Sequence, residues 1–402
     1  MNILVHVPIL DQNWGGTRQY SVGLIRILAQ DMDNRYFIYH NSSDAEIIAV
    51  INDNKQLVQV KDADVCLSWI EQKRIRCKQI LSFIARRLHF EIEIEFNSIL
   101  DRLVDKYAID IVHCPYQFTP ITRKAKTIVT LHDVQEIHFP GFFTAEQRAY
   151  RAVNYLQYLR EADMVIVSYN HVKTDLIEYF AVPATCIHVV LLNMDRLWFE
   201  SLLHKQPVAI DRLKLPEKFL LYPANTWKHK NHIRLLQAIA LLRDEQQCMV
   251  NLVCSGHMNE HYEAEIAPLL ASAELQAQVS FIGVVDEPTL FSLYKHCIGI
   301  VVPTIYEAGS FPLVESILLG VPVVCSNITS LPETINDETM LFNPLDVADI
   351  AYKIEQLWTS NCFRQQSIES GAKARERLKH ADALDKFLAV YITMCCPNKS
   401  EL

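Results

Sequence analysis

The stretch 301–324 constrains the fold of this chain more than any other. It starts with the apolar run 301–302, passes through a turn of small residues around Gly309 and ends in a second apolar run, 321–324. The residues between the turn and Gly320 have the spacing of a short helix, and glycine commonly ends a helix. This pattern predicts one parallel strand–helix–strand unit, because parallel strands need a crossover connection that a helix usually provides.

Two glutamates and a run of amides mark a candidate ligand site in this unit. Glu307 follows the first strand, at the carboxyl edge where open α/β sheets bind ligands, and Glu315 lies about one turn inside the helix. The amides of 309–311 open this helix, and a helix N-terminus is a ready anion site. An isolated pair of glutamates is usually a loop acid and a solvated helix residue. Glu315, however, lies among apolar residues, where a carboxylate needs a partner.

Predicted strands alternate with helical segments along the whole chain, in two groups. The first group starts at 3–7 and ends at 187–192, and the second starts at 219–225 and includes the unit above. This alternation predicts an α/β fold with parallel sheets that carry helices on both faces. The prolines and mixed charge of 202–217 predict a linker between the groups.

The composition is that of a folded protein without a large charge surplus. The 402 residues, 50% of them hydrophobic, suffice for two domains with substantial cores. A formal net charge of −9 argues against nucleic acid as the main partner. The eleven cysteines form no CxxC pair, which is typical of reduced thiols. No apolar run reaches the ~18 residues of a membrane span, and the start lacks signal-peptide features, so a cytoplasmic protein is expected.

Several polar residues follow predicted strands of the first group. His113 and His132 stand at strand ends, where ligand contact is more common than core filling. No HxH or HExxH spacing occurs, so no metal site is predicted. Gly15 and Gly16 lie at a strand-to-helix turn, which alone is weak evidence for a ligand. Arg18 beside them is better explained as a solvated helix residue.

The second group opens with a basic turn. Thr226, Lys228 and Lys230 follow the strand 219–225. A positive side chain at such a turn can neutralise a diphosphate through charge-assisted hydrogen bonds. Lys228 is explained equally well as a solvated loop lysine.

The stretch 307–315 resembles the E-x7-E signature of the family 4 glycosyltransferases, which are retaining nucleotide-sugar enzymes of GT-B architecture. The spacing of the two glutamates fits, as do Pro312, Gly320 and Pro322. The resemblance covers nearly the whole chain and is strongest from 219 to 345. It implies two Rossmann-like parallel-sheet domains that face a central cleft, a nucleotide diphosphate sugar as donor substrate, and no metal cofactor.

The resemblance also implies a domain organisation. We expect an acceptor domain at 1–200, a linker at 201–217 and a nucleotide-sugar donor domain at 218–382. The last segment, 383–402, is then a helix that crosses back to the first domain.

By resemblance, the catalytic candidates are Glu307, His132 and Lys230. Glu307 would bind hydroxyl groups of the transferred sugar, and Lys230 would stabilise charge on the leaving diphosphate. His132 would contact the sugar, whereas His113 is interpreted as a structural or acceptor-side residue. The donor-binding candidates are Gly15, Gly16, Asn225, Thr226, Lys228, Lys230, Gly309, Ser310, Phe311, Pro312, Leu313 and Glu315. The segment 282–284 is a weak candidate for the base contact and equally well a part of the core.

The chain departs from the commoner family pattern at two places. The sequence 308–312 reads Ala-Gly-Ser-Phe-Pro where Gly-Phe-Gly-Leu-Pro is common, which changes the expected amide geometry. An arginine that many members carry shortly before the lysine is absent, and Asn225 and Thr226 stand there. Either Lys228 replaces this arginine, or the two neutral side chains supply hydrogen bonds.

The resemblance implies a hexosyltransferase with a GDP- or UDP-linked donor, in which mannose is favoured by family frequency. Its acceptor would be a saccharide or a lipid-linked saccharide. Two other interpretations stay open, a GT-B nucleotide-sugar epimerase and a catalytically silent GT-B subunit that binds a partner. The basic amphipathic segment 69–90 is a candidate for contact with the inner face of a membrane, although a solvated helix face is the favoured explanation.

Overall fold

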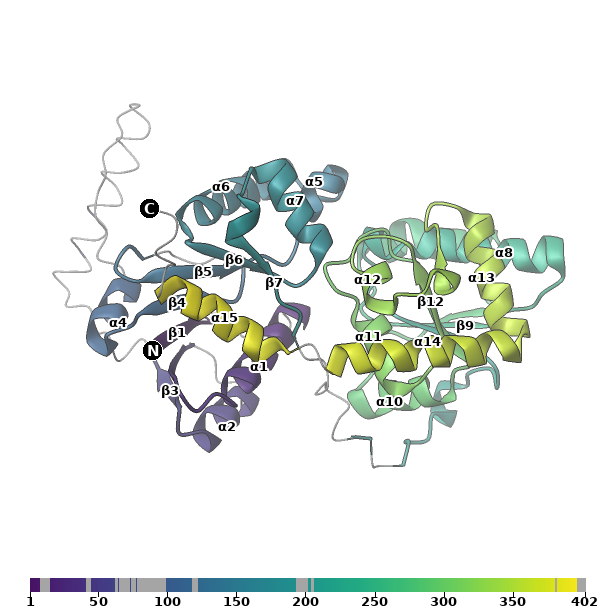
Figure 1. Ribbon diagram of the computed structural model, residues 1–402. Helices are drawn as coiled ribbons and strands as arrows, with labels where there is room; N and C mark the ends of the chain where they lie inside the picture. Colours follow the sequence, from purple (N-terminus) through teal and green to yellow (C-terminus); the bar gives the residue numbers. More distant parts are fainter. Residues whose placement is uncertain are drawn as a thin grey trace.

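The computed structural model describes residues 1–7, 15–40, 45–61, 64, 73, 77, 99–117, 122–192, 202–203, 206–379 and 382–395. These residues form two lobes that lie side by side (Figure 1), and each lobe is built on one parallel sheet. The first lobe holds the N-terminal half of the chain and the second lobe most of the C-terminal half. This arrangement agrees with the predicted α/β fold of two parallel-sheet domains.

The sheet of the first lobe has the order β3-β2-β1-β4-β5-β6-β7. Successive side chains of a strand point to opposite faces, so Ile3 packs in one core and Leu4 in another on the far face of the sheet. The strands are β1 (Asn2–His6), β2 (Arg35–Tyr39), β3 (Leu57–Val60), β4 (Ile111–Cys114), β5 (Lys126–Thr130), β6 (Met164–Val167) and β7 (Ile187–Val189).

Helices cover both faces of this sheet. Because all strands are parallel, their carboxyl ends share one edge, and β5 and β6 run from that edge into α5 and α7. Thr144 and Gln147 form a capping box that fixes the start of α6. The helices are α1 (Gly15–Leu28), α2 (Ala45–Asp53), α4 (Ile99–Tyr107), α5 (Gln135–His138), α6 (Ala145–Glu161) and α7 (Asn170–Phe180).

The second sheet has the order β10-β9-β8-β11-β12-β13. Its strands are β8 (Leu220–Pro223), β9 (Leu252–Ser255), β10 (Val279–Phe281), β11 (Gly299–Val302), β12 (Val323–Ser326) and β13 (Leu341–Phe342). Its helices are α8 (His232–Gln246), α9 (Ala267–Ser272), α10 (Glu287–His296), α11 (Phe311–Leu319), α12 (Leu331–Ile335), α13 (Val347–Thr359) and α14 (Asn361–Lys379). Strands β11 and β12 pair in parallel, with Val301 opposite Val324, and α11 connects them as predicted. Gly320 ends α11 in the left-handed conformation, with a φ of 68°.

The last helix, α15 (Ala383–Cys395), packs on the first lobe although α14 belongs to the second (Figure 1). Phe387 and Tyr391 are fully buried in a core of the first lobe. The Tyr391 hydroxyl hydrogen-bonds Nδ1 of His113 at 2.8 Å, and Nε2 of that histidine lies 3.1 Å from the Thr130 hydroxyl. His113 is therefore a core residue and no ligand contact. The predicted domain boundaries stay a prediction, because 193–201 and 380–381 lie outside the described residues.

One expectation of the sequence analysis falls largely outside the structure. The proposed membrane segment 69–90 lies outside the described residues except for Lys73 and Cys77. Within the part of the chain that the structure describes, every helix is too short or too polar to cross a membrane.

Candidate active site

Lys230 and Glu307 form an ion pair at the carboxyl edge of the second sheet. Lys230 Nζ donates to Glu307 Oε1, and the side chains are 16% and 9% exposed. Burial raises the pKa of Glu307, and the charge of Lys230 opposes this rise. Two of the three predicted catalytic residues thus meet, although 77 residues separate them in the sequence.

The backbone around Lys230 is tied to the loop that carries Glu307. Asn231 follows in the left-handed conformation, and its Nδ2 donates to the carbonyls of Pro303 and Pro344 at 2.8 Å each. The Thr304 hydroxyl and the Ile305 amide both donate to the His229 carbonyl, each at 2.8 Å. Because these contacts fix both loops, the lysine is held beside the acid by the scaffold and not by the ion pair alone.

The helix α11 presents its N-terminus next to this pair. Its cap residue Ser310 is 2% exposed, and the side chain makes no capping hydrogen bond. The first amides of a helix lack partners within the helix and attract anions. Further along, Glu315 is buried and its Oε2 accepts from the Tyr294 hydroxyl at 2.5 Å. Burial, together with the charge of Glu315, raises the pKa of Tyr294. Tyr294 is the partner that a carboxylate among apolar residues requires.

A cavity of about 240 Å³ lies between the lobes, and we call it the interlobe cavity. The first lobe contributes residues from α1 and from the turns after β5 and β6, and the second lobe contributes residues from the start of α11. The lining includes Gly16, Tyr20, His132, Tyr169, Gly309 and Ser310. Lys230, Glu307 and Glu315 are not part of this lining, whereas Ala308 is. Of the predicted residues, Gly16 and His132 of the first lobe therefore meet Gly309, Ser310 and Phe311 of the second lobe at this cavity.

His132 stands at the wall of this cavity. Its Nε2 lies 3.1 Å from the Pro115 carbonyl, which can only accept, so this nitrogen carries the proton. Nδ1 is then left as an acceptor. The ring meets the edge of Tyr20 with centroids 4.7 Å apart. Burial lowers the pKa of His132, which keeps the imidazole neutral at neutral pH.

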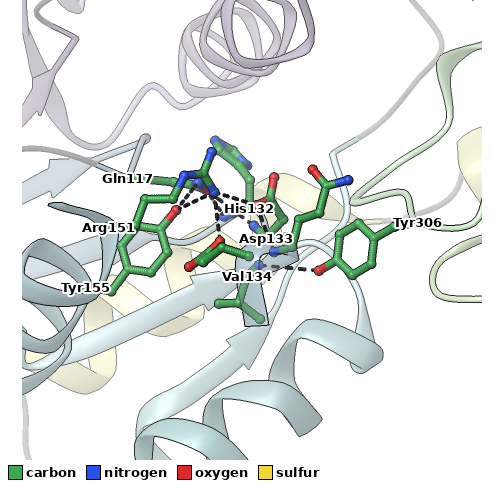
Figure 2. Close-up of polar contacts among 9 residues, drawn as sticks. Gln117, His132, Asp133, Val134, Arg151, Tyr155 and Tyr306 are labelled. Atoms are coloured by element: carbon green, nitrogen blue, oxygen red, sulfur yellow. Dashed lines mark hydrogen bonds and ion pairs between the residues drawn. The ribbon is translucent and has the colours of Figure 1, made fainter. Parts of the chain in front are cut away.

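A polar network holds the turn that carries His132 (Figure 2). Gln117 Oε1 accepts from the amides of His132 and Asp133, both at 3.3 Å. Arg151 donates to Asp133 Oδ1 at 3.3 Å and to the Tyr155 hydroxyl at 3.1 Å. Sequence reasoning missed Gln117 and Arg151, because neither lies in a recognisable motif and their contacts depend on the packing of α6.

Tyr306 connects the lobes directly and was also missed. It precedes Glu307 in the second lobe, is 3% exposed, and its hydroxyl accepts from the Val134 amide of the first lobe at 3.3 Å (Figure 2). Its ring lies 5.5 Å from that of His138 and 6.2 Å from that of His171. A single side chain thus joins the loop of Glu307 to the turn that follows His132.

A second contact between the lobes lies nearby. Asn170, at the start of α7, donates to Glu333 of α12 through its side chain at 2.9 Å and through its backbone amide at 3.2 Å.

The remaining candidates lie around the same edge. Asn225 Oδ1 accepts from the His257 amide at 2.7 Å, and the Thr226 hydroxyl donates to Asn259 Oδ1 at 2.9 Å. Lys228 pairs with Glu265 at 3.0 Å, with both side chains about half exposed.

The glycines and the first turn of α11 complete the set. Gly15 begins α1, and a Cβ at Gly16 would lie 3.0 Å from the Phe311 ring, so the lobes approach closely there. Pro312 and Leu313 are buried in the first turn of α11. Over the described residues, His, Cys, Asp and Glu side chains form no group of three or more that could hold a metal ion.

Two family models match this chain. The model "Glycosyl transferases group 1" matches 208–374, and the model "Glycosyltransferase Family 4" matches 66–191.

Relatives in sequence include several mannosyltransferases. The O-antigen chain mannosyltransferase B of Escherichia coli is 26% identical over 269 residues, which are 66% of this chain and 70% of that protein. The serotype-specific mannosyltransferase WbdA of Escherichia coli is 33% identical over 157 residues, but these span 19% of its length.

Solved structures share the fold at low sequence identity. A glycosyltransferase from Rickettsia africae has a TM-score of 0.64 at 18% identity, with 99% of both chains covered. Anabaena HepE in complex with UDP and glucose has a TM-score of 0.63 at 16% identity, covering 98% of this chain and 99% of HepE.

Proposed function

This chain belongs to the family 4 glycosyltransferases and has their GT-B fold, and from this premise we propose that it is a retaining mannosyltransferase. The donor would be a GDP- or UDP-linked sugar, and the acceptor a saccharide or a lipid-linked saccharide. The mannosyltransferase relatives support the sugar, and the UDP complex of a similar fold supports a nucleotide donor. The observation that carries the proposal is the Lys230–Glu307 pair beside the open end of α11.

Lys230 and the first amides of α11 stabilise the leaving diphosphate. Glycosyl transfer develops negative charge on that group while the sugar becomes an oxocarbenium-like cation. Fixed donors aimed at the developing charge lower the barrier, and one such donor is typically worth about 3 to 4 kcal/mol. An ammonium group has three N–H donors, so Lys230 can keep its contact with Glu307 and still reach a phosphate oxygen.

The acids and the histidine position the donor. Glu307 accepts hydrogen bonds from hydroxyl groups of the transferred sugar, and Glu315 from the ribose. Glu315 already accepts from Tyr294 through Oε2, and a carboxylate has lone pairs for further donors. His132 offers its unprotonated Nδ1 to a sugar hydroxyl from the opposite lobe. The acceptor attacks from the face of the leaving group, and the leaving phosphate takes the proton of the acceptor hydroxyl.

The contacts in the structure favour a neutral substitute for the arginine that is absent before Lys230. Lys228 would have to leave Glu265 to reach a diphosphate. Asn225, in contrast, is already fixed at the carboxyl end of β8, because its Oδ1 accepts from the His257 amide and its Nδ2 can donate to a phosphate oxygen. Thr226 gives its single hydroxyl proton to Asn259 Oδ1. We therefore assign the diphosphate contacts at this turn to Asn225, to Lys230 and to the amides of α11.

Donor turnover tests the proposal. Wild type, incubated with GDP-mannose or UDP-glucose and a panel of saccharide acceptors, should release the nucleoside diphosphate and form a glycoside, and Glu307→Ala should release far less. Epimerised sugar in the absence of any acceptor would support the epimerase instead. If neither wild type nor Glu307→Ala turned over the donor, the protein would be the catalytically silent subunit.

A further inference from the structure

The helix α6 presents an apolar side to solvent. Three large apolar side chains on this side, Tyr150, Val153 and Leu156, are 59%, 64% and 39% exposed. Ala149 on the same side is exposed as well. The opposite side of the helix is buried in cores of the first lobe, through Tyr155, Tyr158 and Leu159.

The exposed apolar residues form one stripe along α6. Side chains three and four positions apart lie on the same side of a helix, and 149, 153 and 156 have this spacing, with Tyr150 beside them. Apolar side chains scattered singly over a surface need no explanation, whereas a contiguous group indicates an interaction site. A valine is also a poorer helix former than most residues, so a solvated helix surface gives no reason for Val153.

Opposite charges mark the two ends of this stripe. Glu146 lies seven positions before Val153 and Arg160 lies seven positions after it, and both side chains are exposed. Because seven residues make about two helical turns, both charges lie on the same side of the helix as Val153. Among the residues that the structure describes, neither Glu146 nor Arg160 has an ion-pair partner.

This pattern is complementary to itself in an antiparallel arrangement. When two copies of α6 pack about a two-fold axis at Val153, Glu146 of each copy lies opposite Arg160 of the other, and Tyr150 lies opposite Leu156. A two-fold interface forms each of these contacts twice, because both subunits present the same surface. A parallel arrangement would instead bring like charges together.

The same charges disfavour a lipid surface as the partner. Glu146 lies at one end of the stripe, and Glu161 follows Arg160 at the other, both of them exposed. Helices that lie on anionic membranes carry an excess of lysine and arginine on their polar side, and this helix surface has none.

We propose that α6 is a self-association surface, on which a second copy of this chain packs its own α6 antiparallel. The inference is independent of the proposed function. The 17 residues of α6 make a surface about 25 Å long and about 10 Å wide, which is less than the roughly 800 Å² per partner of a standard interface. The dimer is therefore weak, with a dissociation constant in the micromolar range or above.

This dimer leaves the site of each copy open. None of the described residues that line the interlobe cavity belongs to α6, and the helix lies at the periphery of the first lobe (Figure 1). On its buried side, α6 carries Arg151, which holds the turn of His132 through Asp133. The second copy thus packs behind the site and adds no residue to it.

Sedimentation velocity of the full chain, over a concentration series that spans the micromolar range, tests the proposal. Wild type should shift from the mass of one chain to that of two as the concentration rises. Val153→Asp places two like charges at the two-fold axis, so its dimer dissociation constant should be at least about tenfold higher. Ile392→Asp is the matched control, because Ile392 is a β-branched residue of α15 that is 54% exposed, and it should dimerise like wild type.

An exchange of charges tests the antiparallel arrangement. Glu146→Arg and Arg160→Glu each turn two attractive contacts per dimer into repulsive ones, so each should weaken the dimer about fivefold or more. The double variant should dimerise like wild type. Within one chain the two residues are about 20 Å apart along the helix, so this rescue cannot come from a pair inside one copy.

A wild type that stays monomeric throughout the series would overturn the inference, and so would a dimer that tolerates Val153→Asp. A double variant as weak as the single variants would refute the antiparallel pairing and the inference with it. Wild type that stays monomeric but binds phosphatidylglycerol vesicles, in contrast to Val153→Asp, would overturn it in favour of a lipid surface. Each of these outcomes leaves the proposed function intact, because that is tested by donor turnover.

Discussion

The contact of Tyr306 with the first lobe should control how the two lobes form one site. Tyr306→Phe removes only the hydroxyl that accepts from the Val134 amide, and Tyr306→Ala also removes the ring that packs against His138 and His171. Because Tyr306 belongs to none of the cores within either lobe, both changes act on the contact between the lobes.

The magnitudes follow from burial. Val134 is fully buried, and an amide left without an acceptor there costs about 1 to 3 kcal/mol. The ring adds about 1.5 to 3 kcal/mol for its buried apolar surface. If the docked arrangement is the active one, kcat/KM should fall about five- to 100-fold in Tyr306→Phe and by about 10² or more in Tyr306→Ala. Affinity for the free nucleotide should stay unchanged, because the proposed diphosphate contacts lie in the second lobe.

Steady-state kinetics with a nucleotide sugar, together with small-angle X-ray scattering, would measure both effects. Tyr306→Ala should show a larger radius of gyration than wild type as well as the lower kcat/KM. A variant with wild-type kinetics and a wild-type scattering profile would refute the reasoning.

Two further predictions concern stability. Lys230→Met leaves Glu307 buried without its cation and should lower the free energy of unfolding by about 3 to 5 kcal/mol. The double variant, Lys230→Met with Glu307→Gln, should lose clearly less. Urea unfolding measures both losses, and equal losses would contradict the pairing. Burial lowers the pKa of His113 to about 3, below its value of about 6.5 in the unfolded chain. The unfolded chain therefore binds the proton first, and this histidine should cost stability progressively as pH falls below about 6.5. Between pH 6.5 and 5, the free energy of unfolding should fall by about 2 kcal/mol less in His113→Gln than in wild type, as measured by urea titrations at each pH. Parallel curves of this free energy against pH would show that the histidine is not buried in its neutral form.

The sequence predicts best those parts of the site that lie within one strand–turn–helix unit. Glu307, Gly309 and Glu315 belong to a single such unit, so their spacing alone places the first two in the turn between β11 and α11 and Glu315 on α11. Lys230 sits at the analogous turn after β8, the neighbour of β11 in the sheet, and parallel strands bring such turns to one edge.

What could not be predicted depends on the docking of distant segments. Val134 and Tyr306 are 172 residues apart, and His113 and Tyr391 are 278 apart. Such contacts have no local periodicity. The charge of Lys228 made it a candidate ligand, but only the packing of the helical segment Tyr262–Ile266 shows that Glu265 is its partner.

A crystal structure of the full chain with GDP-mannose or UDP-glucose bound tests the central claim most directly. We expect the diphosphate at the N-terminus of α11, within hydrogen-bond distance of Lys230 Nζ, with the sugar ring between Glu307 and His132. A nucleotide sugar bound elsewhere, away from the crevice between the lobes, would contradict it.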